Sequence, residues 1–246
     1  MAVVVAVACG DVPTFEGGIA YVTPISLPSP AVAVGDVLRD SLGNPAPLQV
    51  VAYDKNNAVI ANVTPTYVVT SLPAGVTIDS SGVVTAFDSL RTVTIVARVG
   101  SRIQTTPATL LVVAQPDSMQ LGASADSLVS FTKTGGLQVK VTGVRRGTRV
   151  PVDGIVVRYQ ITKVNGSTVV DTGSHILVDA SGSPLRLDGR RAVDTTKSGG
   201  LATRYLTPVS LTGVDSLVVE ARANSLRGIP LAGSPVRFVL PVKKGG

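Results

Sequence analysis

Apolar and polar residues alternate with a period of two along much of the chain. The clearest runs are 92–99, 137–142, 155–162, 217–222 and 236–240. Successive side chains of a β-strand point to opposite faces of a sheet, so this pattern predicts strands that bury one face. No stretch shows sustained helical periodicity. The sequence therefore predicts an all-β protein.

Turn-forming residues separate the apolar runs. Asp79–Gly82 lies between two short apolar runs, and Asn165-Gly166 follows a longer one. Both patterns are typical of hairpins, because Gly and Asn accept the positive φ angles that tight turns require. Strands this short, joined by turns this frequent, indicate antiparallel β-sandwiches.

The length of 246 residues fits two such domains, because domains cluster near ~100–150 residues. A small, polar stretch near 115–126 is the best candidate for the boundary. We expect a truncated signal-like segment and a Pro/Gly-rich tether over 1–31, a first domain over 32–114, a linker over 115–126 and a second domain with a short basic tail over 127–246. Only 4% of the residues are aromatic and Trp is absent, so we expect aliphatic cores.

The N-terminus contains the single cysteine of the chain. Small residues, Ala6 and Ala8, precede Cys9, and the short apolar run before it cannot span a bilayer. This segment resembles the end of a bacterial lipoprotein signal, which implies a lipid on Cys9 and contact with a membrane through that lipid alone. The alternative is an ordinary buried strand with a plain thiol. A lone cysteine excludes an intrachain disulfide.

Two segments of the predicted first domain, LPAGVTID at 72–79 and SGVVTA at 81–86, resemble bacterial immunoglobulin-like (Ig-like) domains of surface adhesins. In the second domain, 214–221 and 233–238 resemble the Ig-like repeats of invasin and intimin. The resemblance implies two consecutive Ig-like β-sandwiches in a protein of the cell envelope or outer surface. It also implies a module that displays other domains or adheres to a surface protein or a glycan.

The sequence offers little for catalysis. His175 is the only histidine, and no nucleophile motif accompanies it. One His and one Cys cannot form a zinc site. Asp79, Asp179 and Asp188 lie in Gly-containing turns, where a carboxylate either caps backbone N–H groups or contributes to a calcium site. We therefore expect no enzyme activity, no metal and no cofactor.

Basic residues suggest one binding hypothesis. The formal net charge is +6, and arginines cluster in two predicted loops that could converge at one end of a sandwich. The alternative is ordinary solvated surface charge. We expect no nucleic-acid partner, because aromatic residues are sparse. A second possible function is an accessory module that binds a carbohydrate or an anionic polymer. The candidate residues of the anionic-ligand patch are Arg145, Arg146, Arg149, Arg186, Arg190 and Arg191.

Overall fold

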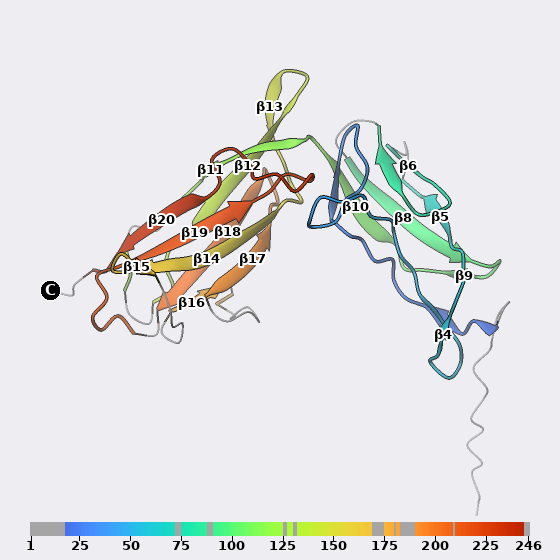
Figure 1. Cartoon of the computed structure of the whole chain (residues 1–246), viewed down its shortest axis with the longest axis horizontal. Coiled ribbons are helices and arrows are strands. Elements are labelled where there is room, and N and C mark those ends of the chain that lie inside the picture. Colours follow the sequence, from blue (N-terminus) through green and yellow to red (C-terminus); the bar gives the residue numbers. More distant parts are fainter. Residues whose placement is uncertain are drawn as a thin grey trace, which may run out of the picture.

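The computed structural model shows two β-sandwiches that lie end to end (Figure 1). It describes residues 18–71, 75–87, 91–124, 127–129, 132–168, 175–179, 181–182, 190–208 and 210–243. The chain passes from the first sandwich to the second at Ala114 and Gln115, between β10 and β11. In the described residues, no helix is long and apolar enough to cross a membrane.

The first sandwich is built on a sheet with the order β2-β10-β8-β5, and β9 pairs with β8. A three-stranded sheet, β1-β3-β4, and the hairpin β6-β7 complete it. Its strands are β1 (Tyr21–Val22), β2 (Ala31–Ala33), β3 (Ala52–Tyr53), β4 (Val59–Ile60), β5 (Thr66–Val69), β6 (Val76–Ile78), β7 (Val84–Ala86), β8 (Arg91–Val99), β9 (Ile103–Gln104) and β10 (Ala108–Val113).

The second sandwich contains two five-stranded sheets. One has the order β11-β12-β18-β16, with β13 on β12, and the other has the order β15-β14-β19-β20, with β17 on β14. The strands are β11 (Pro116–Leu121), β12 (Leu137–Arg145), β13 (Thr148–Pro151), β14 (Val156–Val164), β15 (Ser167–Thr168), β16 (His175–Val178), β17 (Arg191–Thr195), β18 (Leu201–Pro208), β19 (Ser216–Ala223) and β20 (Val236–Pro241).

Both domains have antiparallel sheets, and in both a segment at the C-terminal end of the domain also pairs in parallel with an early segment. In the first domain β2 pairs in parallel with β10, and in the second Leu128 forms a parallel bridge with Val242. Sheets packed face to face around a single core define a β-sandwich. The fold class expected from the sequence, two consecutive Ig-like β-sandwich domains, is confirmed.

The period-two runs bury the faces that the sequence indicated. Leu137, Val139 and Val141 of β12 are all fully buried, and Phe238 and Leu240 of β20 face the same core. A one-residue shift in register would turn each set toward water, so burial specifies the register. The predicted hairpin turns are also present, with positive φ angles at Gly82, Asn165 and Gly166.

The core of the first domain is aliphatic, as expected, with Leu38, Ile95 and Leu110 fully buried. The same expectation was wrong in part for the second domain. Its two largest fully buried side chains are Tyr159 and Phe238. The Tyr159 hydroxyl donates a hydrogen bond to the Ala202 carbonyl (2.8 Å), which satisfies the one polar group that the ring carries into the core.

Two expected boundaries need correction. The region 115–126, expected to be a linker, contains β11, which pairs with β12 and buries Met119 in the core of the second domain. The region 1–31, expected to be a tether, contributes β1 and the buried side chains Ile19 and Ile25 to the first domain. Both segments are polar or rich in Pro, so neither shows the alternation that marks a central strand.

Candidate functional site: the junction of the two sandwiches

An ion-pair cluster joins the two domains. Asp36 of the first domain is 8% exposed, and its carboxylate accepts hydrogen bonds from two arginines. Arg39 Nη2 lies 2.9 Å from Oδ1, and Nε of Arg227, in the loop between β19 and β20, lies 2.7 Å from Oδ2. Arg39 also donates to the Gly43 carbonyl. One carboxylate thus fixes its own loop and binds the neighbouring domain.

The charge of Asp36 is stabilised by this environment. Burial alone would raise the pKa of Asp36, but the hydrogen bonds from Arg39, Arg227 and the Val37 N–H outweigh it. The pKa of Asp36 therefore lies below its ordinary value. At neutral pH the group is a carboxylate, and the joint between the domains is an ionic one.

Close backbone contacts surround this ion pair. A β-carbon on Gly43 would collide with the carbonyl group of Arg227, and one on Gly228 would collide with the Leu42 carbonyl. A β-carbon on Gly154 would lie 2.7 Å from the β-carbon of Ala31. These glycines let the two domains touch through their backbones, so larger residues there would push the domains apart.

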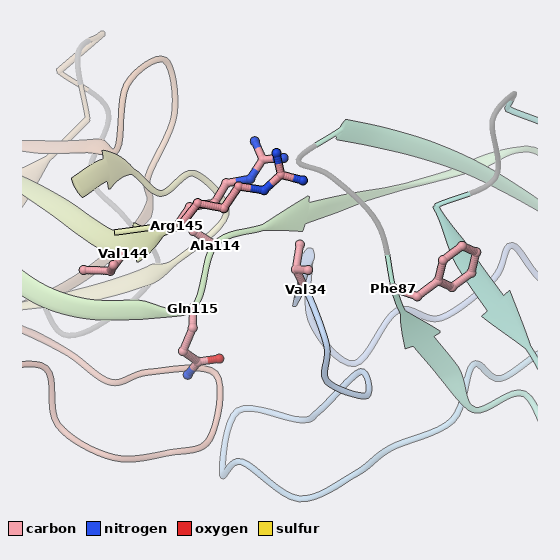
Figure 2. A pocket seen from close by; sticks show the side chains of 7 residues that line it. Val34, Phe87, Ala114, Gln115, Val144 and Arg145 are labelled. Atoms are coloured by element: carbon pink, nitrogen blue, oxygen red, sulfur yellow. The ribbon is translucent and has the colours of Figure 1, made fainter. Parts of the chain in front are cut away.

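A cleft of about 310 Å³ opens beside the junction. It is lined by residues of both domains, among them Val34, Phe87, Val144, Arg145 and Arg146, and none of the lining residues is acidic. Figure 2 shows the Arg145 side chain extending from the second domain toward the part of the first that carries Val34. Phe87 is 57% exposed and Val144 is 48% exposed, so the cleft combines open apolar surface with positive charge.

The two cleft arginines have no partner within the described part of the chain. Neither Arg145 nor Arg146 forms a hydrogen bond or ion pair there through its side chain, whereas Arg149 binds Asp117 at 2.8 Å. Arg146 adopts a positive φ of 49° in the turn between β12 and β13, a conformation that Asn or Gly adopts more readily. This turn places two adjacent guanidinium groups at the cleft. Chemically, the cleft is suited to an anionic group attached to an apolar one.

The structure does not bring the two predicted arginine clusters together. Arg145, Arg146 and Arg149 lie at the β12–β13 hairpin, in the sheet that also contains β11, β18 and β16. Arg191 begins β17 in the opposite sheet and pairs with Gln160. Arg190 precedes it, so the clusters do not converge. Arg186 and Cys9 lie outside the described residues.

The other residues considered from sequence are placed as follows. His175 starts β16, where its backbone pairs with Pro208. Asp79 accepts hydrogen bonds from the N–H and Oγ of Ser81, and Asp179 does the same with Ser181, as expected for capped turns. Asp188 lies outside the described residues. Among the described residues, no three His, Cys, Asp or Glu side chains come together to hold a metal.

Sequence reasoning missed the apolar part of the cleft. Val34 follows β2, Phe87 follows β7 and Val144 is near the end of β12, so nothing in the local sequence indicates that they meet. A partial signal existed: Val144 is exposed immediately beside Arg145, where the alternation of β12 ends. The site becomes recognisable only when the two domains are seen in contact with each other.

No family model matches the chain, and no curated protein matches its sequence. Several solved structures do resemble it. The D00-D0 domains of intimin are 10% identical, with 91% of this chain and all of that chain covered and a TM-score of 0.29. The D0-D1 domains of intimin are 18% identical over 88% of this chain and 98% of that one, with a TM-score of 0.28. Domains 4 and 5 of the S-layer protein SbsC are 14% identical over 78% and 89%, with a TM-score of 0.28. The likeness is one of fold alone.

Proposed function

We propose that this chain is a non-catalytic Ig-like module of the cell envelope or outer surface, which adheres to an acidic segment of a protein partner. The observation that carries the proposal is the junction cleft, where Arg145 and Arg146, which pair with no described residue, lie beside the exposed side chains of Val34 and Phe87. Concave sites with apolar walls and a few convergent polar groups are the usual places for ligands. In this proposal the module presents the cleft to its partner and acts as a spacer in the protein that contains it.

An acidic peptide fits the cleft for two reasons. Paired guanidinium groups bind a carboxylate through charge-assisted hydrogen bonds, which are stronger than neutral ones. When an apolar side chain of the peptide covers the exposed Phe and Val beside them, the burial stabilises the complex by about 25 cal/mol for each Å² of apolar surface. An acidic residue next to an apolar one in an extended peptide supplies both groups.

The test is a fluorescence anisotropy titration of the full chain with short labelled peptides of alternating Glu and Leu. We expect saturable binding to this peptide and none to a Lys-Leu peptide. Arg145→Gln with Arg146→Gln should raise the Kd by about tenfold or more, because two charge-assisted contacts are lost. Phe87→Ser should weaken binding through the lost apolar contact.

The matched control is Arg98→Gln with Arg102→Gln, which removes the same charge from exposed positions of the first domain. This variant should bind as the unaltered chain does. Equal losses of peptide affinity in the two double variants would show that binding depends only on net charge, and would overturn the proposal.

A further inference from the structure

The outer face of the sheet β15-β14-β19-β20 carries a second group of arginines. Arg158 of β14, Arg222 of β19 and Arg237 of β20 all point away from the core, because their strand neighbours Tyr159, Ala221 and Phe238 are buried. The Arg222 and Arg237 side chains are 58% and 66% exposed. We call these three residues the arginine face.

A buried carboxylate orients two members of the arginine face. Glu220 is 5% exposed; its Oε2 lies 2.6 Å from Arg222 Nη2 and its Oε1 lies 2.9 Å from Arg237 Nε. Burial alone would raise the pKa of Glu220, but the two arginines outweigh it and hold that pKa below its ordinary value. Each guanidinium has five N–H donors, so most of them stay available on the exposed side.

The third arginine lies where it repels its neighbour. Arg158 is directly opposite Arg222 in the β14–β19 pairing, and within the described residues its side chain has no hydrogen bond or ion pair. Like charges directly opposite each other weaken a sheet. Asp40 lies at the edge of the same surface, but its carboxylate accepts from the backbone of Leu42 and Asn44 instead. An anion bound between Arg158 and Arg222 would relieve the repulsion.

The dimensions of the arginine face indicate what kind of anion it fits. Adjacent strands are about 5 Å apart, so three neighbouring strands spread the positive charge over about 10 Å. Glu220 already occupies one contact of Arg222 and of Arg237, and a chain with repeated anionic groups can follow the row of three guanidinium groups across the strands. The described outer-face residues of β14, β19 and β20 include no aromatic side chain of the kind that anchors most protein partners and single-stranded nucleic acids.

We propose that the arginine face binds a linear polysaccharide that carries sulfate or carboxylate groups. Arg158 and Arg222 contact one anionic group and Arg237 contacts the next, while Glu220 acts as a positioning residue. This binding is independent of the junction cleft, which faces the first domain and uses other residues.

The test measures binding of the full chain to immobilised heparin, which is sulfated, to alginate, which carries only carboxylates, and to neutral dextran. We expect binding to heparin, to alginate or to both, weakening as salt rises, and no binding to dextran. Arg158→Gln with Arg222→Gln should raise the Kd by about tenfold at constant salt, and Arg237 still pairs with Glu220 in that variant. Arg158→Glu, which breaks no hydrogen bond among the described residues, repeats the test with minimal risk to folding.

Arg98→Gln with Arg102→Gln again serves as the charge-matched control and should leave the Kd within about twofold. Three results would overturn the proposal. They are no binding to either anionic polysaccharide, equal losses of affinity in the face and control variants, or equally tight binding of poly-glutamate by the variant with Arg145→Gln and Arg146→Gln, whose cleft lacks both arginines. The variant with Arg145→Gln and Arg146→Gln should still bind heparin or alginate. A failure of the proposal for the arginine face can therefore be distinguished from a failure of the proposal for the cleft.

Discussion

At the scale of single residues, Asp36 joins two parts of the chain that lie far apart in sequence. It binds Arg39, three positions away, and Arg227, which is 191 positions away. Asp36 is largely buried although Arg227 is exposed, so removing one of its arginine partners leaves the buried carboxylate with less compensation for its charge. The junction therefore depends on this carboxylate.

The first prediction concerns the pH dependence of Asp36. Its folded pKa is depressed, so its contribution to stability is complete above the unfolded pKa of about 3.9 and is lost as pH falls through the folded value. Asp36→Asn should lower the free energy of unfolding by about 1–3 kcal/mol at neutral pH. The difference between Asp36→Asn and the unaltered chain should shrink as the solution becomes more acidic than the unfolded pKa.

Urea denaturation at several pH values measures this difference. Asp54→Asn, in an exposed turn of the same domain, is the control for general effects of losing a carboxylate. A difference between Asp36→Asn and the unaltered chain that stays constant or widens in acid would contradict the assigned role.

Residue-scale prediction from sequence succeeded where partners are local. The Asp79 turn could be predicted, because its hydrogen-bond donors lie two and four positions away. The Asp36–Arg227 pair could not, because no pattern in one sequence links residues so distant. The same limit hid the cleft, since Val34, Phe87 and Arg145 come from three separate segments.

At the scale of elements, the β14–β15 hairpin is fastened to the loop that precedes β19. Asn165 Oδ1 accepts from the N–H groups of Asp215 (2.6 Å) and Ser216 (3.2 Å), and its Nδ2 donates to the Gly213 carbonyl (2.7 Å). Asn165 also adopts a positive φ of 49°. One side chain thus serves both the turn and its attachment.

Two substitutions separate these roles of Asn165. Asn165→Gly keeps the positive φ and loses the side-chain hydrogen bonds, so it should destabilise the second domain by about 1 kcal/mol. Asn165→Ala loses the bonds and also strains the backbone, so it should cost about 1 kcal/mol more. Thermal or urea unfolding checks the order. Equal stabilities of the two variants would show that the positive φ carries no cost.

Element-scale prediction succeeded for the long central strands and failed for the edges. β12, β14 and β19 alternate cleanly because one face of each is buried in the core. The edge strand β11 begins at Pro116 and is largely polar, so its sequence resembles a loop. β1 is only two residues long, too short for any period to appear.

At the scale of the whole molecule, the proposed function requires that the two sandwiches keep one relative orientation. The cleft exists only while Val34 and Phe87 of the first domain and Arg145 of the second line it together. Interfaces between domains are often mobile. Two features restrain this one: the close contacts at Gly43 and Gly154, and the ion pair between Asp36 and Arg227.

The distance distribution between the two domains tests this requirement most directly. Spin labels at Ser80→Cys and Gln120→Cys, both exposed and in different domains, are placed in a Cys9→Ser background and measured by pulsed electron resonance. We expect one narrow distance distribution for the chain with its natural junction. Gly43→Val with Arg227→Ala should broaden it, because the first change forces the backbones apart and the second removes the ion pair. A natural junction as broadly distributed as that of the variant would contradict a fixed cleft.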